Sequence, residues 1–194
     1  MNVPLHCLYP VLSRRKGICL ILLLSILCFC VSAGAQKYKS ASGTVSFSSD
    51  APIEKIAATN SSISALMDLS SGEVACSVRI MGFEFKKSLM KEHFNEKYME
   101  SDRFPNATFQ GTITGYRPDL SGAQQLMGKG QLTIHGHTQM IEIAASFEVG
   151  SREILMAATF IVKLEDYKIR IPKLLWKNIA EEVEVRVNLV FKPL

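Results

Sequence analysis

Apolar and polar residues alternate along much of the chain, with an apolar residue at every second position. Successive side chains of a β-strand point to opposite faces of a sheet, so this spacing predicts strands with one face in an apolar interior and the other in water. The residues expected to face inward are Val45 and Phe47 and the apolar members of residues 74–80, 126–134, 141–149 and 183–191.

Residues 154–164 have a different pattern, because both faces of this predicted strand are apolar. Ile154, Met156 and Phe160 belong to one face, and Leu155 and Ile161 belong to the other. A strand that is apolar on both faces is typical of a sheet that is covered on both sides. We therefore expect a loop or a helix to cover the outer face of this strand.

Residues that favour turns separate the predicted strands. Segments 68–72 and 117–122 each contain Asp, Ser and Gly, which favour reversals of the chain. Gly136 lies between two long alternating segments and predicts a reversal there, and Gly150 with Ser151 predicts a two-residue hairpin turn. Such short connections are typical of neighbouring antiparallel strands.

Two segments interrupt the β-pattern. In residues 88–98 one face repeats at helical spacing, and Ser88 is expected to cap the N-terminus of this helix. In residues 171–178, Pro172 lacks a backbone N–H, so the preceding strand is expected to end there. The repeating face of the predicted helix consists of Leu89, Met90, His93, Phe94, Lys97 and Tyr98.

The predicted elements are about eight strands with one or two short helices, which defines an all-β protein. Many antiparallel strands must each bury one face and must also protect their edges. A closed antiparallel eight-stranded β-barrel meets both requirements. A sandwich of two sheets is the main alternative.

The N-terminal segment has the three parts of a secretory signal peptide. Arg14, Arg15 and Lys16 form a basic cluster, an apolar run covers residues 18–31, and small residues follow at 32–35. The apolar run is shorter than the roughly 20 residues that span a bilayer as a helix. We predict a signal peptide over residues 1–35, a domain over residues 36–194, a periplasmic or secreted location and no stable membrane span after cleavage. A retained signal anchor is the alternative.

Removal of this leader changes the reading of charge and of cysteine content. The leader carries three of the 22 basic residues and none of the 18 acidic ones, so residues 36–194 are nearly neutral. Nucleic-acid binding therefore has no electrostatic support. Of the five cysteines, only Cys76 lies outside the leader. It belongs to an alternating segment, so we expect a small buried apolar residue and no disulfide.

Three segments resemble the signatures of one known family. Residues 90–101 with 103–109, residues 130–138 and residues 164–172 resemble, in the same order, segments of the YceI-like polyisoprenoid-binding proteins. The resemblance implies a lipocalin-like antiparallel barrel of eight strands whose apolar interior holds a polyisoprenoid chain. It also agrees with export, because many members of the family are exported.

With this resemblance, the inward-facing residues become candidates for a lipid-binding site. The helix over residues 88–98 is the expected lid, where His93 and Tyr98 meet a polar headgroup, although a structural hydrogen bond is an alternative role for His93. Apolar area must provide most of the affinity for an isoprenoid, and Met and Phe suit that task. The predicted ligand-binding residues are Met81, Phe83, Phe85, Met90, His93, Phe94, Tyr98, Phe104, Phe109, Ile134, Phe147, Met156, Phe160 and Trp176.

The sequence offers little support for catalysis or for a metal site. It contains no G-x-S-x-G motif, and no second His follows Glu92 and His93 at metalloprotease spacing. His135 and His137 are possible metal ligands, but no third ligand can be assigned. We therefore predict no catalytic residue, no metal and no cofactor, apart from a bound isoprenoid or isoprenoid quinone held for transport or storage. A ligand-free structural or stress-related interaction module with a packed barrel is the alternative, and a homodimer remains open.

Overall fold

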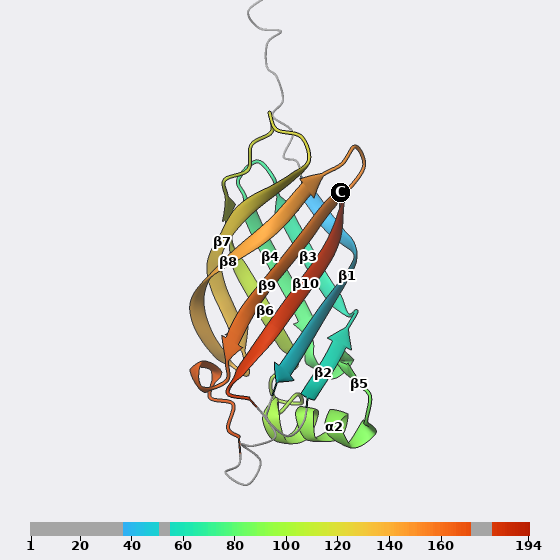
Figure 1. The fold of residues 1–194 in the computed structure, drawn as a ribbon, viewed down its shortest axis with the longest axis vertical. Coiled ribbons are helices and arrows are strands. Elements are labelled where there is room, and N and C mark those ends of the chain that lie inside the picture. The colour runs from blue at the N-terminus through green and yellow to red at the C-terminus, as the bar shows by residue number, and fades with distance from the viewer. Residues whose placement is uncertain (1–36, 51–54, 172–179) are drawn as a thin grey trace, which may run out of the picture. The chain divides into compact units, whose positions relative to one another are not determined.

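The computed structural model describes residues 37–50, 55–171 and 180–194 (Figure 1). Most of the described residues belong to β-strands, as the alternation predicts, and one helical segment lies between β5 and β6. The strands are β1 (Lys37–Asp50), β2 (Lys55–Asn60), β3 (Ile63–Asp68), β4 (Glu73–Arg79), β5 (Glu84–Phe85), β6 (Asn106–Thr114), β7 (Ala123–Ile134), β8 (His137–Val149), β9 (Ile154–Lys163) and β10 (Glu182–Pro193).

The strands form a closed antiparallel barrel of eight strands. Closure comes from the pairing of the last strand with the first, which runs from Tyr38 opposite Pro193 to Ser48 opposite Glu184. The short strands β2 and β3 keep one antiparallel register against β1, so together they act as one interrupted strand of the barrel. The closing pair leaves no free edge between β1 and β10, which rules out the sandwich.

Alternation along the strands follows the prediction. In β7, for example, buried and exposed residues alternate along almost the whole strand, with Leu126 and Leu132 buried. The same inward orientation holds for Val45 in β1 and for Val183 and Leu189 in β10. The period-two pattern therefore identifies the interior face of the barrel, since each step along a strand reverses the side chain.

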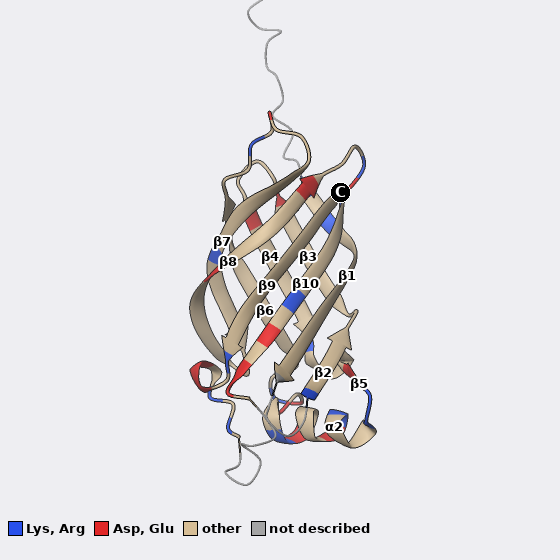
Figure 2. Ribbon diagram, viewed as in Figure 1, with Lys and Arg blue, Asp and Glu red and all other residues tan. Residues whose placement is uncertain are grey.

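The outer face of β9 is open to solvent, which corrects the expectation that a loop or helix covers it. The Leu155 side chain is 44% exposed and Ile161 is 54% exposed. Figure 2 shows no charged residue along β9 before its end, in agreement with its sequence up to Lys163. Scattered exposed apolar residues are common on protein surfaces, so an apolar outer face does not require a cover.

The turns of the barrel confirm three of the predicted reversals, at 68–72, 117–122 and Gly136, and correct the fourth. His135 and Gly136 both have positive φ angles, of 51° and 72°, and they connect the paired residues Ile134 and His137. A two-residue turn with two positive φ angles is type I′, in which Gly is favoured. The β8–β9 connection at Gly150 is a four-residue loop, not the predicted two-residue turn, because Val149 pairs with Ile154.

The predicted helix forms, but it begins and continues differently from the expectation. The α-helix α2 (Ser88–His93) is followed by the π-helical segment η2 (Phe94–Tyr98). The N-cap residue is Lys87, not Ser88, and no side chain caps the helix. The short helix lies across one end of the barrel (Figure 1). Among the described residues, none of the helices has the length and apolar character needed to cross a membrane.

Other short helical turns complete the fold. They are η1 (Ile80–Gly82), between β4 and β5, and η3 (Glu165–Tyr167), after β9. The strand β9 ends at Lys163 and η3 follows it, so the strand ends well before the expected position, and Pro172 itself lies outside the described residues. At the end of the barrel near α2, which we call the mouth, His135 contacts Tyr167 of η3 and Glu100, which follows η2.

Two groups of buried apolar residues fill different parts of the barrel. One group lies near α2 and includes Ile80, Phe83 and Met99. The other, which we call the closed-end cluster, lies toward the end of the barrel where the C-terminus is found (Figure 1). The closed-end cluster consists of Ala65, Met67, Val74, Leu126, Phe147, Ile154, Leu189 and Phe191.

Candidate functional site

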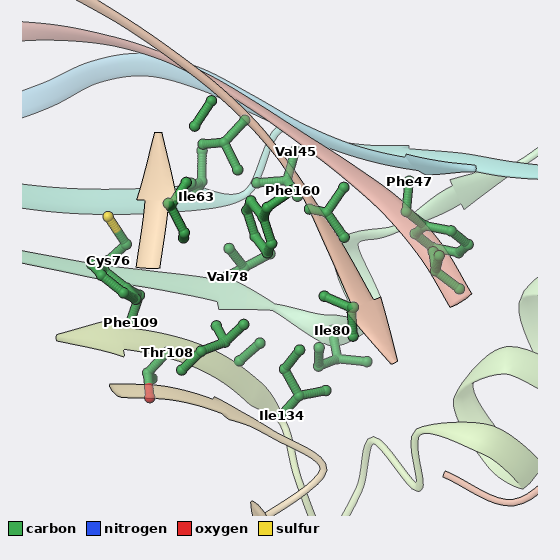
Figure 3. A pocket seen from close by; sticks show the side chains of 18 of the residues that line it. Val45, Phe47, Ile63, Cys76, Val78, Ile80, Thr108, Phe109, Ile134 and Phe160 are labelled. Atoms are coloured by element: carbon green, nitrogen blue, oxygen red, sulfur yellow. The ribbon is translucent and has the colours of Figure 1, made fainter. Parts of the chain in front are cut away.

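The barrel contains an apolar cavity of about 220 Å³, which we call the inner chamber (Figure 3). Its walls come from β1, β3, β4, β6, β7, β8, β9 and β10, together with residues of η1, η2 and the segments that follow η2 and β9. Phe160 and Val187 face this cavity and are only partly buried, although both point into the barrel. Inward-pointing side chains that keep accessible surface show that the centre is hollow at this level.

The chemistry of the inner chamber is almost entirely that of hydrocarbon. Among the described residues that line it, Thr108 and Cys76 alone carry a side-chain oxygen or a thiol. Figure 3 shows both heteroatoms among otherwise carbon side chains. Burial raises the pKa of the Cys76 thiol to about 11, so it is protonated at neutral pH. The walls therefore offer apolar surface and no charge.

A second cavity of about 310 Å³, the outer chamber, lies between the barrel end and α2. Its walls combine apolar side chains with polar groups, which include Ser49, Lys87, His93 and Tyr98. Partial burial raises the pKa of the Tyr98 phenol, so this group remains a neutral hydroxyl that can donate or accept a hydrogen bond. The outer chamber thus has several hydrogen-bonding side chains, whereas Thr108 carries the single hydroxyl among the described residues of the inner one.

The two chambers adjoin at a shared wall. The residues that line both chambers are Phe47, Phe94, Met99, Leu164, Ile169 and Val183. Phe47 lies at the centre of an aromatic group, because its ring is 5.5 Å from that of Phe94, 5.3 Å from Phe83 and 5.9 Å from Phe85. Aromatic rings at these separations attract each other at little cost in polar desolvation. The rings of Phe47 and Phe94 therefore belong to an apolar wall that the two chambers share.

Beyond the closed-end cluster lies a crevice of about 200 Å³ at the other end of the barrel. It is lined by the β3–β4 turn, where Asp68 accepts hydrogen bonds from the backbone N–H groups of Ser70 and Ser71, and by Tyr116, Leu126 and Phe147. Hydrogen bonds from Ser70 lower the pKa of Asp68. Leu126 and Phe147 lie between this crevice and the inner chamber, since their cluster packs against chamber-lining Met156.

The structure places most of the predicted ligand-binding residues around the two chambers. It does not place Met81, which is 47% exposed, Phe104, whose ring packs on His135, or Phe147, which is buried in the closed-end cluster. Trp176 lies outside the described residues. Phe83, Phe109, Ile134, Met156 and Phe160 line the inner chamber, Phe85, Met90, His93 and Tyr98 line the outer one, and Phe94 lines both.

Several chamber residues were missing from the sequence prediction. Phe47 and Val45 had the correct inward pattern, but an alternating pattern does not tell a packed position from a cavity wall. Met99 and Ile169 follow the helical segments η2 and η3, where period-two alternation is lost, whereas Leu164 continues the inward face of β9. The signal that could have found them is their position next to the predicted lid and at the end of β9.

His135 connects three segments at the mouth of the barrel. Its Nδ1 lies 3.2 Å from the carbonyl oxygen of Tyr167, and its Nε2 lies 3.2 Å from Oε1 of Glu100. Hydrogen bonding by Arg103, and secondly by His135, lowers the pKa of the Glu100 carboxyl. The ring of His137 is 6.1 Å away, and the part of the chain that the structure describes contains no group of three metal-ligating side chains. His135 is a structural anchor in this arrangement.

A family model described as the YceI-like domain matches residues 33–191. The chain belongs to the YceI-like domain family. The segments of this YceI-like chain that carried the resemblance meet at the mouth, because His135 contacts both Glu100 and Tyr167. The family signatures therefore contribute to the α2–η2 segment, to its contact with His135 and to the adjoining strands.

Solved structures show the same fold as this YceI-like chain. A polyisoprenoid-binding domain from Saccharophagus degradans, implicated in plant cell wall breakdown, is 13% identical with a TM-score of 0.70 and covers 81% of this chain and 98% of its own. BcnA from Burkholderia cenocepacia is 15% identical with a TM-score of 0.66, covering 76% and 95%.

A YceI protein from Campylobacter jejuni is 16% identical with a TM-score of 0.53 and covers 68% of this chain and 81% of its own. At these identities the likeness establishes the lipocalin-like barrel fold of the family. A comparison with curated proteins found no significant match.

Proposed function

We propose that this YceI-like protein binds a polyisoprenoid, an isoprenoid quinone or a similar amphiphile, and that it does so for transport or storage in the periplasm or outside the cell. The role is binding and not catalysis. The leader-like residues 1–35 support export. The lipid class is supported by the family and by the polyisoprenoid-binding domain among the solved structures of this fold.

The observation that carries the proposal is the hollow apolar inner chamber. A cavity of about 220 Å³ whose described walls carry no charge cannot solvate water well, and apolar cavities of this kind stay dry or take an apolar guest. Each Å² of apolar ligand surface that leaves water contributes roughly 25 cal/mol. A hydrocarbon tail is therefore the guest that the chamber favours over any polar molecule.

The position of the polar groups gives the ligand a direction. Lys87, His93 and Tyr98 line the outer chamber, whereas among the described residues of the inner chamber Thr108 alone carries a hydroxyl and none carries a nitrogen or a charge in its side chain. A polar headgroup avoids desolvation only where hydrogen-bonding partners are present. We therefore place the headgroup beside these polar groups of the outer chamber, with the tail in the apolar part of that chamber and in the inner chamber.

The alternative of a ligand-free module with a packed barrel has one observation in its favour. The closed-end cluster is packed, with Phe147 only 1% exposed and Phe191 0% exposed. This packing covers one end of the barrel and does not extend to the inner chamber. A packed module is therefore the weaker proposal.

The test is to identify what the protein carries. The mature protein is purified without detergent, extracted with organic solvent, and the extract is analysed by mass spectrometry. We expect an isoprenoid or a related amphiphile in near-stoichiometric amount.

Two variants of neighbouring residues make the test specific for the chamber. Ala158→Leu adds a branched side chain to the chamber wall and is expected to reduce the extracted lipid, whereas Ala157→Leu adds the same group to the outer face and leaves it unchanged. An extract free of lipid, together with no uptake of added quinone or polyprenol, contradicts the proposal.

A further inference from the structure

We infer that the barrel selects its ligand by chain length, and that the closed-end cluster sets the limit at about four isoprenoid units. The inference rests on the proposed lipid-binding function and names a property of the same site. It concerns the tail and not the headgroup.

The closed end of the barrel is filled with side chains. Phe191 is 0% exposed, Phe147 is 1% exposed and Leu126 is 3% exposed. The cluster packs directly against Met156 and Val187, which line the inner chamber. Close-packed side chains leave no room for a chain of even one carbon in width. A tail that enters from the α2 end therefore stops at this cluster.

The volumes limit how much tail the protein can hold. A cavity of about 150 Å³ holds one benzene molecule, which has six carbons. On this scale the inner chamber of about 220 Å³ holds about nine carbons, and with the outer chamber of about 310 Å³ the total is about 20 carbons. An isoprenoid unit has five carbons, so four units fill both chambers.

A longer tail gains little from its additional carbons. The closed-end cluster blocks movement deeper into the barrel, so further units have to leave through the mouth beside α2. Affinity for an apolar chain follows the area removed from water, and the units outside the mouth remain in water. Binding is therefore expected to increase with length up to about four units and then to level off.

Phe147 is the residue whose removal should extend the limit. It belongs to the closed-end cluster and pairs in register with Met156, which lines the inner chamber. On its other side it lines the crevice of about 200 Å³ at the end of the barrel. Replacing Phe by Ala deletes a ring of six carbons, so Phe147→Ala opens space between chamber and crevice for about one more unit.

The experiment measures the binding of linear isoprenoid alcohols with two to eight units to the delipidated mature protein, by displacement of anilinonaphthalene sulfonate dye. For the natural sequence we expect affinity to rise about tenfold or more per unit up to four units and to change less than about threefold beyond. For Phe147→Ala the plateau moves to at least five units. Leu155→Ala on the exposed outer face is its control.

A second variant approaches the limit from the other side, without deleting any core side chain. Ala158 faces the inner chamber and pairs in register with Ala145 and Val187. Ala158→Leu fills part of the chamber, so the plateau should move to three units, whereas Ala157→Leu on the outer face should not move it. This variant keeps the test decisive if Phe147→Ala does not fold.

The outcomes separate the two proposals. If no alcohol of any length binds, the proposed lipid-binding function itself fails. If the alcohols bind but affinity continues to rise through eight units, or if Ala158→Leu leaves the plateau in place, the function stands and the length limit is overturned.

Discussion

Two phenylalanines that occupy equivalent positions in the alternating pattern have different surroundings. Phe147 of β8 and Phe160 of β9 both point into the barrel. Phe147 is 1% exposed within the closed-end cluster, whereas Phe160 faces the inner chamber and is only partly buried. The difference follows from where each residue lies along the barrel and not from the residue type.

This difference predicts unequal costs for the same substitution. Phe147→Ala should lower the free energy of unfolding by about 3–5 kcal/mol, because it leaves a cavity in a packed cluster. Phe160→Ala should cost clearly less in the delipidated protein, because its ring already borders empty space and loses fewer contacts. Urea unfolding of the two variants, beside Leu155→Ala as a surface control, measures both. Equal costs for the two would indicate a barrel that is packed throughout.

Cys76 reports on the same chamber through its pKa. Burial raises the pKa of this thiol to about 11. Maleimide reacts with the thiolate, so at pH 8 the folded protein should react more than about 100-fold slower than the unfolded protein. At pH values below this pKa, the labelling rate of the folded protein should rise about tenfold for each unit by which the pH increases. Mass spectrometry after timed labelling measures it, and labelling as fast as that of the unfolded chain would contradict a buried thiol.

At the scale of elements, the position of α2 depends on contacts outside the helix itself. The six-residue helix α2 has no side-chain cap and no buried residue, and its continuation η2 is π-helical. The segment after η2 is held by Glu100, which bonds with Arg103 and with His135 of the β7–β8 turn. A short helix is not stable alone in water, so these contacts and the apolar packing of Phe94 maintain its position.

The Glu100 contacts predict how stability depends on pH. The pKa of Glu100 is lowered from its ordinary value of 4.5, mainly by Arg103. A lowered carboxyl pKa stabilises the fold above that ordinary value, and the contribution is lost as pH falls through the lowered pKa. Glu100→Gln should therefore lower the melting temperature by a few degrees at pH 7 and by less below about pH 4.

Melting curves across pH, with the exposed Glu96→Gln as control, test this expectation. An equal deficit for Glu100→Gln at every pH would mean that the carboxylate charge is not the stabilising feature.

Sequence reasoning succeeded for elements with a regular period and failed where the period ends. Alternation identified the inward face of β7 and β10, and Gly136 identified its turn, because both signals are local. It did not foresee the exposed outer face of β9, the longer loop after Val149 or the helix start at Lys87. Nor could it separate the packed Phe147 from the chamber residues, since that depends on how strands are staggered around the closed barrel.

At the scale of the whole molecule, a hollow barrel is less stable than a filled one. The inner chamber of about 220 Å³ leaves side chains such as Phe160 without partners on one side. A ligand that occupies the chamber supplies those contacts in the folded state only. Binding and folding are then linked, and capacity for lipid is gained at the expense of stability in the empty protein.

This linkage predicts a crossing pattern of melting temperatures. A ligand at 100 times its Kd adds about 2.7 kcal/mol, which raises the melting temperature of a domain of this size by about 5–10 °C. Ala158→Leu should raise the melting temperature of the delipidated protein, because the new side chain fills part of the chamber, and should reduce the gain from ligand. Ala157→Leu, on the outer face, should keep the full gain in melting temperature from ligand, with a change in the free energy of unfolding below about 0.5 kcal/mol.

Calorimetry of both variants, with and without an isoprenoid alcohol, measures these melting temperatures. If Ala158→Leu lowers the stability of the empty protein by as much as an overpacked core does, the chamber is not hollow at Ala158, and the link between empty volume and lipid capacity is wrong.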